Sequence, residues 1–434
     1  MYAWVAGLLG LRVDRDDHGG PDRHGHDGRT GTAIPRRDGV DDRAVVVSLF
    51  GRFVDELASG LPLVLMPTLQ ARLGLSVAQV GWLLQALHAV AAVVEPVAAV
   101  AIDVMDRRPL LVWGALGWAV SLLLVAGAPT YGWLVLAFVA AGAASGPLAH
   151  TTDVLLVEMH PGAEERIGTR QTLLDTAGAL LAPAAVAVVG WLGGDPRVPL
   201  VVTGISIVGY AILLAATPMP GPAAASASSV AVDGSADDAA GRIATWSLGR
   251  IRRNVVDVLR VREARLWIAA LFAEMVADTP ALFEPVWLAG DVGASQTLVA
   301  VHAGVELAAS LVGLALLDRW LRHHSARSAL TAACVANLLI YPVWLAVPGV
   351  VAKIVLVVPL AVTVAPIWPL VRARALAAVP GRGGVVMALT SVFGVLPLAG
   401  LFGWVSAQVG LTPTMLAVTM AGTLAIVLIV RARA

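Results

Sequence analysis

The sequence predicts an all-α membrane protein with twelve transmembrane helices in two parallel six-helix repeats. Three observations lead to this prediction. Of the 434 residues 58% are hydrophobic and only 14% are charged, the apolar residues form long runs, and the two halves share sequence features. Soluble domains contain roughly 45–50% apolar and about 25% charged residues, so the composition argues against a soluble enzyme, a nucleic-acid-binding protein or a disordered scaffold.

The apolar runs have the length of membrane helices. A transmembrane helix needs about 20 apolar residues, whereas a strand of a membrane barrel needs about 10 of alternating polarity. The runs are of the first kind and contain glycine and proline, which membrane helices tolerate. The predicted spans are 44–66, 78–101, 109–128, 131–157, 168–192, 197–216, 265–289, 295–317, 328–347, 350–371, 383–408 and 412–430.

Polar segments divide the chain into four parts. Residues 1–43 are rich in Asp, Arg, Gly and His and are expected to form a disordered cytoplasmic tail. Residues 44–216 and 265–430 are expected to form the N-terminal and C-terminal six-helix bundles. The connector 217–264 starts as an Ala/Gly/Ser/Pro-rich flexible linker. Its arginine-rich second part, 241–264, predicts an amphipathic helix on an anionic leaflet, with partner binding as the alternative.

The distribution of basic residues predicts the orientation in the membrane. The loops after even-numbered spans, and the C-terminus, carry Arg107, Arg108, Arg166, Arg319, Arg322, Arg327, Arg372, Arg374, Arg382, Arg431 and Arg433. The loops after odd-numbered spans carry Arg72, Arg197 and Lys353, the last being the only lysine. Both termini and the connector are therefore expected in the cytoplasm, and the protein is expected in the inner (plasma) membrane of the cell.

An internal repeat relates the two halves. In spans one and seven, Asp55 and Asp278 are each followed seven residues later by a proline. Spans two and eight end in AVAIDVMDRR (99–108) and LALLDRWLRH (314–323). A Pro-Gly pair follows both span four and span ten. Because the three matches come in the same order, they predict two halves of the same orientation.

The loop after span two resembles a motif of the major facilitator superfamily of transporters, G-x-L-A-D-R-x-G-R-R. The residues that match are Asp103, Arg107 and Arg108 in the first half and Asp318, Arg319 and Arg322 in the second. The resemblance covers about residues 44–430 and implies the major facilitator fold. It also implies that these gating-loop residues form a cytoplasmic charge cluster, pairing between bundles, that stabilises the outward-facing state. A purely topogenic role is the alternative.

A finer resemblance is to the fosmidomycin-resistance branch of efflux pumps. It is carried by DELASGLPLVLMP (55–67), LGLSVAQVG (73–81) and the Glu95-Pro96 pair. His150 stands where that branch has a His-Pro-Glu element, although two threonines follow it here. The resemblance implies efflux of a drug of the phosphonate type.

Acids within the first span are candidates for transport chemistry, because a charge inside the bilayer is costly and needs a function or a partner. Asp55 and Glu56 lie in the middle of this span, and Arg52 lies one helical turn before Glu56. The spacing predicts an Arg52–Glu56 pair. Asp55 then faces Ser59 as a protonatable site or substrate contact. One closed arginine–acid cluster without titration is the alternative.

Spans seven and eight carry further acids. Asp278 has Glu274 four residues before it, and repulsion between them would favour the protonated form of one. Arginine partners from other helices are the alternative. Glu306 has His302 four residues before it and is a second proton-relay candidate. Glu284 is expected nearer the outer face, where it lines the vestibule.

The cytoplasmic side of the first half contributes another set. Glu95, His150 and Asp175 are expected to line the cavity there, with a hydrogen-bonded core role as the alternative for the histidine. Gly178 and Pro183 resemble the G-x-x-x-G-P segment of proton antiporters in the superfamily, with alanine in place of the second glycine. The resemblance implies helix bending, and small-residue packing is the alternative.

These features predict a secondary transporter that exports a small organic molecule, a drug or a metabolite, in exchange for protons by alternating access. Proton-coupled uptake is the alternative, and the direction of flux separates the two. A non-transporting sensor or an intramembrane enzyme is less favoured. The chain has no HExxH, GxSxG or GxxxxGK motif.

The expected partners are a small-molecule substrate, protons and lipid, with no nucleic acid, and the protein is expected to be a monomer. No cofactor and no metal are expected. The tail histidines His18, His24 and His26 lack a defined ligand spacing, and the single cysteine, Cys334, excludes a Cys-based metal site. The acids of the cavity favour cationic or neutral substrates, whereas the fosmidomycin resemblance favours a phosphonate.

Overall fold

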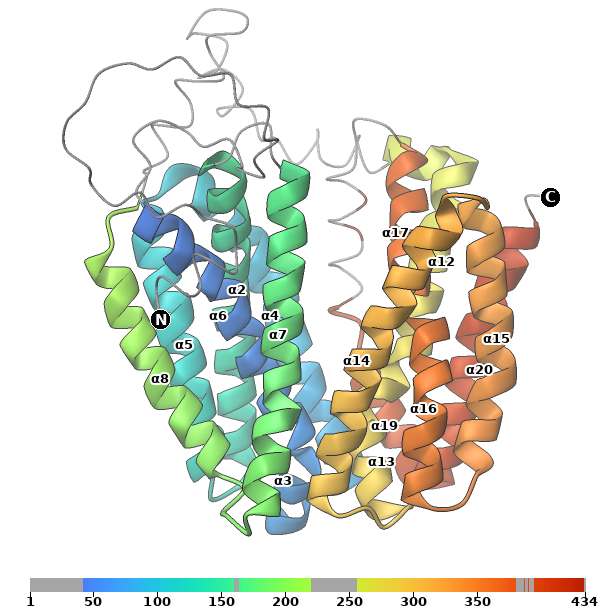
Figure 1. Cartoon of the computed structure of the whole chain (residues 1–434), viewed down its shortest axis with the longest axis horizontal. Coiled ribbons are helices and arrows are strands. Elements are labelled where there is room, and N and C mark those ends of the chain that lie inside the picture. The colour runs from blue at the N-terminus through green and yellow to red at the C-terminus, as the bar shows by residue number, and fades with distance from the viewer. Residues whose placement is uncertain are drawn as a thin grey trace, which may run out of the picture.

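The computed structural model describes residues 42–159, 164–219, 256–379 and 394–432, together with positions 386 and 389. Every regular element in these segments is a helix, so the predicted all-α membrane fold is confirmed. Figure 1 shows the helices as two bundles side by side, with the first half of the chain in one and the second half in the other.

The N-terminal bundle contains the helices that precede the connector. They are α2 (Asp42–Val64), α3 (Met66–Leu73), α4 (Val77–Val104), α5 (Arg107–Gly127), α6 (Tyr131–Met159), α7 (Glu164–Trp191) and α8 (Val198–Ala216). Capping residues begin several of these helices. Ser76 accepts a hydrogen bond from the backbone N–H of Gln79 to begin α4, and Asp106 caps α5 in a similar way.

The C-terminal bundle has more interruptions. It contains α12 (Arg262–Asp278), the short 3₁₀ helix η1 (Thr279–Phe283), α13 (Glu284–Gly290), α14 (Gln296–Leu321), α15 (Ala326–Ala346), α16 (Val350–Val364), α17 (Ile367–Ala377), α19 (Leu398–Val409) and α20 (Leu411–Arg431). Spans seven and ten, predicted as continuous, each break in the middle, and α19 begins only at Leu398. Prolines at positions 280, 366 and 397 lie at these breaks and cannot donate the helical hydrogen bond.

Ten of the twelve predicted spans form described helices that are long and apolar enough to cross a membrane. The first span is absent from the ten because α2 carries Arg52, Asp55 and Glu56 within one stretch of about 18 residues. Of the eleventh, the structure describes the helix α19, which has 12 residues and is too short to be counted as a span.

The two halves contact each other at one end of the molecule, which we call the closed end. Gly81 of α4 and Gly403 of α19 pack backbone to backbone, and a methyl group added at Gly81 would lie 2.5 Å from the carbonyl oxygen of Ala399. Gln296 accepts a hydrogen bond from Thr68 at 2.8 Å and donates one to a backbone carbonyl of α2. At the opposite end the described helices of the two bundles diverge (Figure 1).

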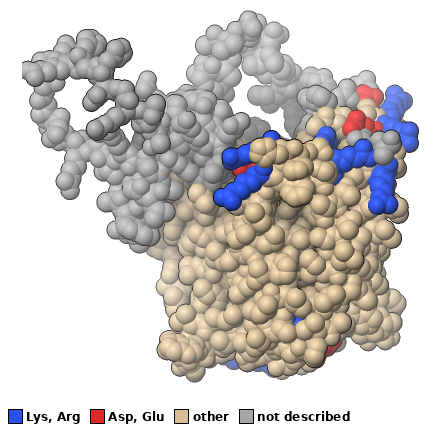
Figure 2. Space-filling model, turned by 45° about the vertical axis from the view of Figure 1, so that its right-hand side comes forward, with Lys and Arg blue, Asp and Glu red and all other residues tan. Residues whose placement is uncertain are grey.

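Basic residues gather at the end opposite the closed end. On the face drawn in Figure 2, most Lys and Arg side chains lie there, and a broad band without charged residues covers the surface below. The exposed arginines include Arg108, Arg322, Arg374 and Arg431, all near helix ends. The apolar band is what a lipid-facing surface requires.

The predicted tail 1–43 and the amphipathic helix 241–264 lie largely outside the described residues. Of the second, residues 256–260 are described and helical, with Val258 fully buried and the side chain of Arg260 exposed. Val256 and Leu259 of the same stretch are exposed, so the amphipathic helix remains a prediction.

Gly178 allows α7 to pack closely against α2. A methyl group at this position would overlap the backbone carbonyl oxygen of Phe53. Gly178→Ala is therefore expected to lower the free energy of unfolding by about 1–3 kcal/mol, because main-chain atoms must move apart. Thermal denaturation in detergent measures the change. Gly209 of α8, which has open space around it, is the matched control. Gly209→Ala should leave stability unchanged or raise it, and equal losses in both variants would contradict the close-packing role.

Candidate functional site

A cavity of about 430 Å³ lies between the two bundles, and we call it the central cavity. Glu56, His88 and Pro183 border it from the N-terminal half, and Asp278 and Glu306 border it from the C-terminal half, among other residues. A neighbouring cavity of about 500 Å³ is bordered by Gln85, His88, Glu274, Asp278 and Trp368. Asp278 borders both, so the two cavities share this carboxylate.

The charged side chains that line these cavities are all acidic among the described residues. They are Glu56, Glu274, Asp278, Glu284 and Glu306, and the other titratable side chains are mainly histidines 88 and 302. No lysine or arginine borders the cavities within the described segments. A low-dielectric space with acidic walls attracts cations and protons and repels anions.

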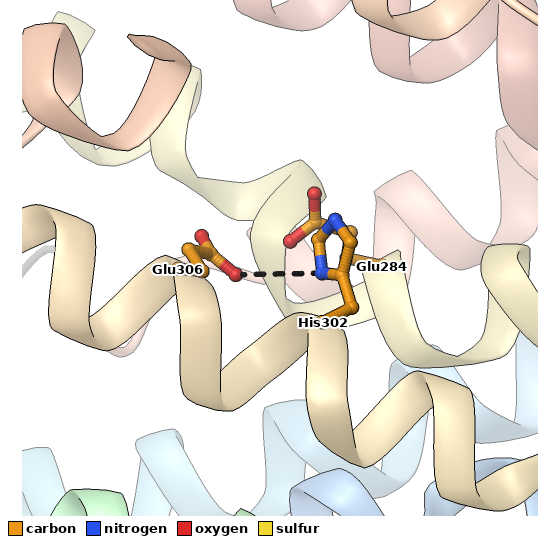
Figure 3. Close-up of side chains that lie close together, drawn as sticks. All are labelled: Glu284, His302 and Glu306. Carbon is orange, nitrogen blue, oxygen red and sulfur yellow. Dashed lines mark ion pairs between the residues drawn. The ribbon is translucent and has the colours of Figure 1, made fainter. Parts of the chain in front are cut away.

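The densest part of the acidic wall joins α13 and α14 (Figure 3). His302 and Glu306 lie one turn apart on α14, with 3.9 Å between Nδ1 and Oε2, as their spacing predicts. Glu284 at the start of α13 brings a third ligand atom within 4.8 Å of the other two. Glu284 is buried and belongs to this cluster, so its expected place at the outer vestibule was wrong.

Lys353 lies behind this cluster rather than in a loop. It is 2% exposed, and its Nζ donates to the carbonyl oxygens of Trp344 (2.8 Å) and Leu345 (3.0 Å). The ammonium also lies 4.4 Å from the centre of the Trp287 ring. The two carbonyl dipoles and the aromatic face thus stabilise the positive charge of the buried ammonium group.

Asp55 does not border the cavities. It is 6% exposed, its Oδ1 accepts a hydrogen bond from Nε1 of Trp118 at 2.7 Å, and its Oδ2 accepts one from Ser145 at 3.4 Å. Trp118 itself borders the central cavity. Asp55 thus lies one layer behind the wall, and the adjacent Glu56 takes the wall position. The repeat mate Asp278 is exposed to the cavities, so the two related acids differ in environment.

Arg52 pairs with Asp175 rather than with Glu56. Its Nε and Nη2 each donate to one carboxylate oxygen of Asp175 at 2.8 Å, in a bidentate pair between α2 and α7. Asp153 of α6 lies 3.5 Å from Nε and accepts a hydrogen bond from Gln171. The predicted Arg52–Glu56 pair was therefore wrong. Spacing on one helix permits that pair, but it cannot reveal a better-oriented carboxylate on a neighbouring helix.

Glu95 and His150 meet across α4 and α6. Glu95 Oε2 lies 3.8 Å from His150 Nε2, and both side chains are about one-third to two-fifths exposed (32% and 43%). The two residues, predicted separately, form one pair within the first bundle. Gly178 and Pro183 lie on the continuous helix α7, where Pro183 borders the central cavity.

A family model described as the Major Facilitator Superfamily matches residues 48–403, most of the chain. The protein belongs to this superfamily. Among curated proteins no sequence matches the chain. Members of this superfamily place their substrate sites between two bundles of helices, which is where the cavities of this protein lie.

Solved structures share the fold at low sequence identity. A bacterial homolog of the human lysosomal transporter Spinster, in an inward-facing and occupied conformation, matches with a TM-score of 0.64 and 15% identity over 89% of this chain and 93% of that chain. The nucleoside transporter NupG matches with a TM-score of 0.68 and 12% identity over 90% of this chain and 98% of that chain. Both are transporters, and at such identities the likeness shows the fold alone.

The gating-loop pair of this superfamily member that the structure describes lies within one bundle. Asp318 instead pairs with Arg322 of its own helix at 2.7 Å, and both side chains are exposed (70% and 68%). Arg319 is exposed, Arg107 is buried at the start of α5, and the side chain of Asp103 lies outside the described part. The predicted pairing between bundles is thus wrong for Asp318. The reason is that the bundles diverge at this end.

Sequence analysis missed Gln85. Its Nε2 donates to the carbonyl oxygen of Gly394 and its Oε1 accepts from the backbone N–H of Ala399, both at 3.2 Å. One amide thereby satisfies backbone groups on both sides of the break before α19. The sequence carried one signal for this contact. Gln85 is a polar residue inside an apolar span, and a span in the other half is interrupted by Pro397.

Proposed function

We propose that this superfamily member exports a small organic cation across the inner membrane in exchange for protons. The observation that carries the proposal is the acidic lining of the central cavity, described above, to which both bundles contribute. A cationic substrate gains favourable electrostatics there, whereas an anionic one would meet carboxylates with no lysine or arginine among the described lining residues.

Competition for the same carboxylates supplies the exchange mechanism. Glu56, Asp278 and Glu306 border the cavity and can hold either a proton or the charge of a substrate. If one carboxylate cannot do both at once, binding of a proton on one side of the membrane releases the cation, and the reverse occurs on the other side. Coupling between two ligands of this kind typically amounts to 1–3 kcal/mol.

The arginine distribution supports the orientation that export requires. From the positive-inside rule we infer that the basic end in Figure 2 faces the cytoplasm. The closed end then faces outward, and the described conformation is one in which the bundles diverge toward the cytoplasm. A cytoplasmic substrate would enter from that side.

Export of a phosphonate is a second candidate, supported by the residues that resemble the fosmidomycin-resistance branch, 55–67 and 73–81. The lining of the cavities is less suited to it, because no lysine or arginine borders them in the described segments. The charge of the transported molecule therefore separates the two candidates.

Flux measurements in proteoliposomes test the proposal. Radiolabelled tetraethylammonium and a phosphonate of similar size are presented on the side of the basic end, with an imposed pH gradient. The expected result is movement of the cation in the direction opposite to the protons. Movement of the phosphonate alone would favour the second candidate, movement of the cation with the protons would indicate uptake, and no gradient-dependent movement of either would contradict the proposal.

A further inference from the structure

The cluster of Glu284, His302 and Glu306 has the composition of a transition-metal site. One nitrogen and two carboxylate oxygens come from two adjacent helical segments, α13 and α14, and their ligand atoms lie within 4.8 Å of one another. All three residues border the central cavity. Motif analysis could not find this set, because Glu284 is separated from the other two in the sequence.

The histidine lacks the partners that a buried imidazole normally has. His302 is 1% exposed, and its Nε2 makes no hydrogen bond within the described part of the protein. Its Nδ1 lies 3.9 Å from Glu306, which is too long for a hydrogen bond. A buried polar nitrogen without a partner is unfavourable, so the ring has hydrogen-bonding and lone-pair capacity that a ligand can use.

We propose that Glu284, His302 and Glu306 bind a divalent transition-metal cation from the central cavity. Around tetrahedral zinc, ligand atoms at 2.0–2.2 Å from the metal lie roughly 3.3 Å apart, so side-chain shifts of about 1 Å complete the site. Three protein ligands leave a fourth position open, as in exchangeable zinc sites. That position faces the central cavity, where water or a solute can take it.

The surrounding charges are compatible with a bound cation. Asp278 borders the same cavity and adds negative charge. Lys353 opposes it, but its Nζ is held by two backbone carbonyls and by the face of Trp287 on the other side of the cluster. The ring of Trp344 packs against His302 with centroids 5.8 Å apart and fixes the imidazole from behind. Two carboxylates and a neutral imidazole would balance the charge of one divalent ion.

Zinc binding to the purified full-length protein tests the site. Calorimetry is performed after treatment with a chelator, in a background in which the tail histidines are replaced (H18A, H24A and H26A), because these can bind metal independently of the cluster. One saturable site is expected, with release of protons from the ligands that gives a buffer-dependent enthalpy. Magnesium should not compete, since an imidazole ligand suits transition metals rather than hard cations.

Two ligand variants and one control decide the assignment. His302→Gln and Glu306→Gln are each expected to weaken zinc binding at least about tenfold, the lower bound seen even for residues that only support a ligand. The control replaces the surface residues His323 and His324 by glutamine, which should leave the affinity unchanged. Zinc should also raise the melting temperature of the parent protein and not that of His302→Gln.

Three outcomes would overturn the inference. They are the absence of a saturable site in the parent protein, unchanged affinity in His302→Gln, and loss of binding only in the surface control. If one ligand variant does not fold, the other ligand variant decides the assignment, and the absence of a saturable site in the parent protein overturns the inference by itself. The inference is independent of the proposed export function, because binding is measured at equilibrium without a membrane gradient.

Discussion

Replacing Arg52 with methionine is expected to lower the free energy of unfolding by about 3–5 kcal/mol. The change leaves the carboxylate of Asp175 without its bidentate partner and removes the guanidinium that lies 3.5 Å from Asp153. The Arg52 and Asp175 side chains are only 17% and 22% exposed, so water does not replace the lost contact. Breaking a buried ion pair by removing one partner typically costs this much. Thermal denaturation in detergent measures the loss.

A double variant shows whether the loss comes from the unpaired carboxylate. Arg52→Met combined with Asp175→Leu should recover much of the stability, because no uncompensated charge then remains at that position. Arg322→Met is the matched control, since it breaks an exposed pair worth about 0.3–0.5 kcal/mol. A loss at Arg52 as small as that at Arg322 would contradict a structural role for the bidentate pair.

Asp278→Asn is expected to reduce pH-gradient-driven transport by about tenfold or more, consistent with typical coupling free energies of 1–3 kcal/mol. Asparagine keeps the size and polarity of the side chain but cannot take up or release a proton. Exchange of labelled for unlabelled substrate without a gradient should persist, because it needs no net proton movement. Flux in proteoliposomes with and without an imposed pH gradient measures both quantities.

The repeat mate provides the matched comparison. Asp55 holds two hydrogen bonds behind the cavity wall, so Asp55→Asn should keep most gradient-driven transport. Sequence analysis names both acids as candidates for proton coupling, and we propose Asp278 because it borders the central cavity. Loss of coupling in Asp55→Asn with retention in Asp278→Asn would assign the role to Asp55 instead.

The membrane fold was predictable because the bilayer imposes a length and an apolar composition on every spanning helix. Sequence periodicity could not locate the points near Asp278 and Leu398 at which the helices are interrupted. Many membrane helices contain a proline. Whether the helix is interrupted there depends on whether neighbouring helices can satisfy the freed backbone groups. Gln85 satisfies the backbone at one such break from the other bundle, and this contact cannot be inferred from either segment alone.

The candidate site was predictable in composition but not in partners. The acids inside spans were identified because each needs a reason to be in the membrane, and His302–Glu306 follows from helical spacing. Spacing gives the face on which a side chain lies but not which helix packs there. For this reason the partner of Arg52 and the place of Glu284 were predicted wrongly. For the same reason the sequence could not show that Glu56, and not Asp55, borders the central cavity.

The glycine contact at the closed end has a mechanical consequence. Since Gly81 and Gly403 touch through main-chain atoms, no side chain of these two residues separates α4 from α19 at this point. From Gly81 to Val104, at about 1.5 Å per residue, α4 extends roughly 35 Å, so a rotation of about 10° displaces its far end by roughly 6 Å. We therefore expect this contact to serve as a pivot from which α4 extends as a long lever arm. A small turn there is amplified into an opening wide enough for a small solute.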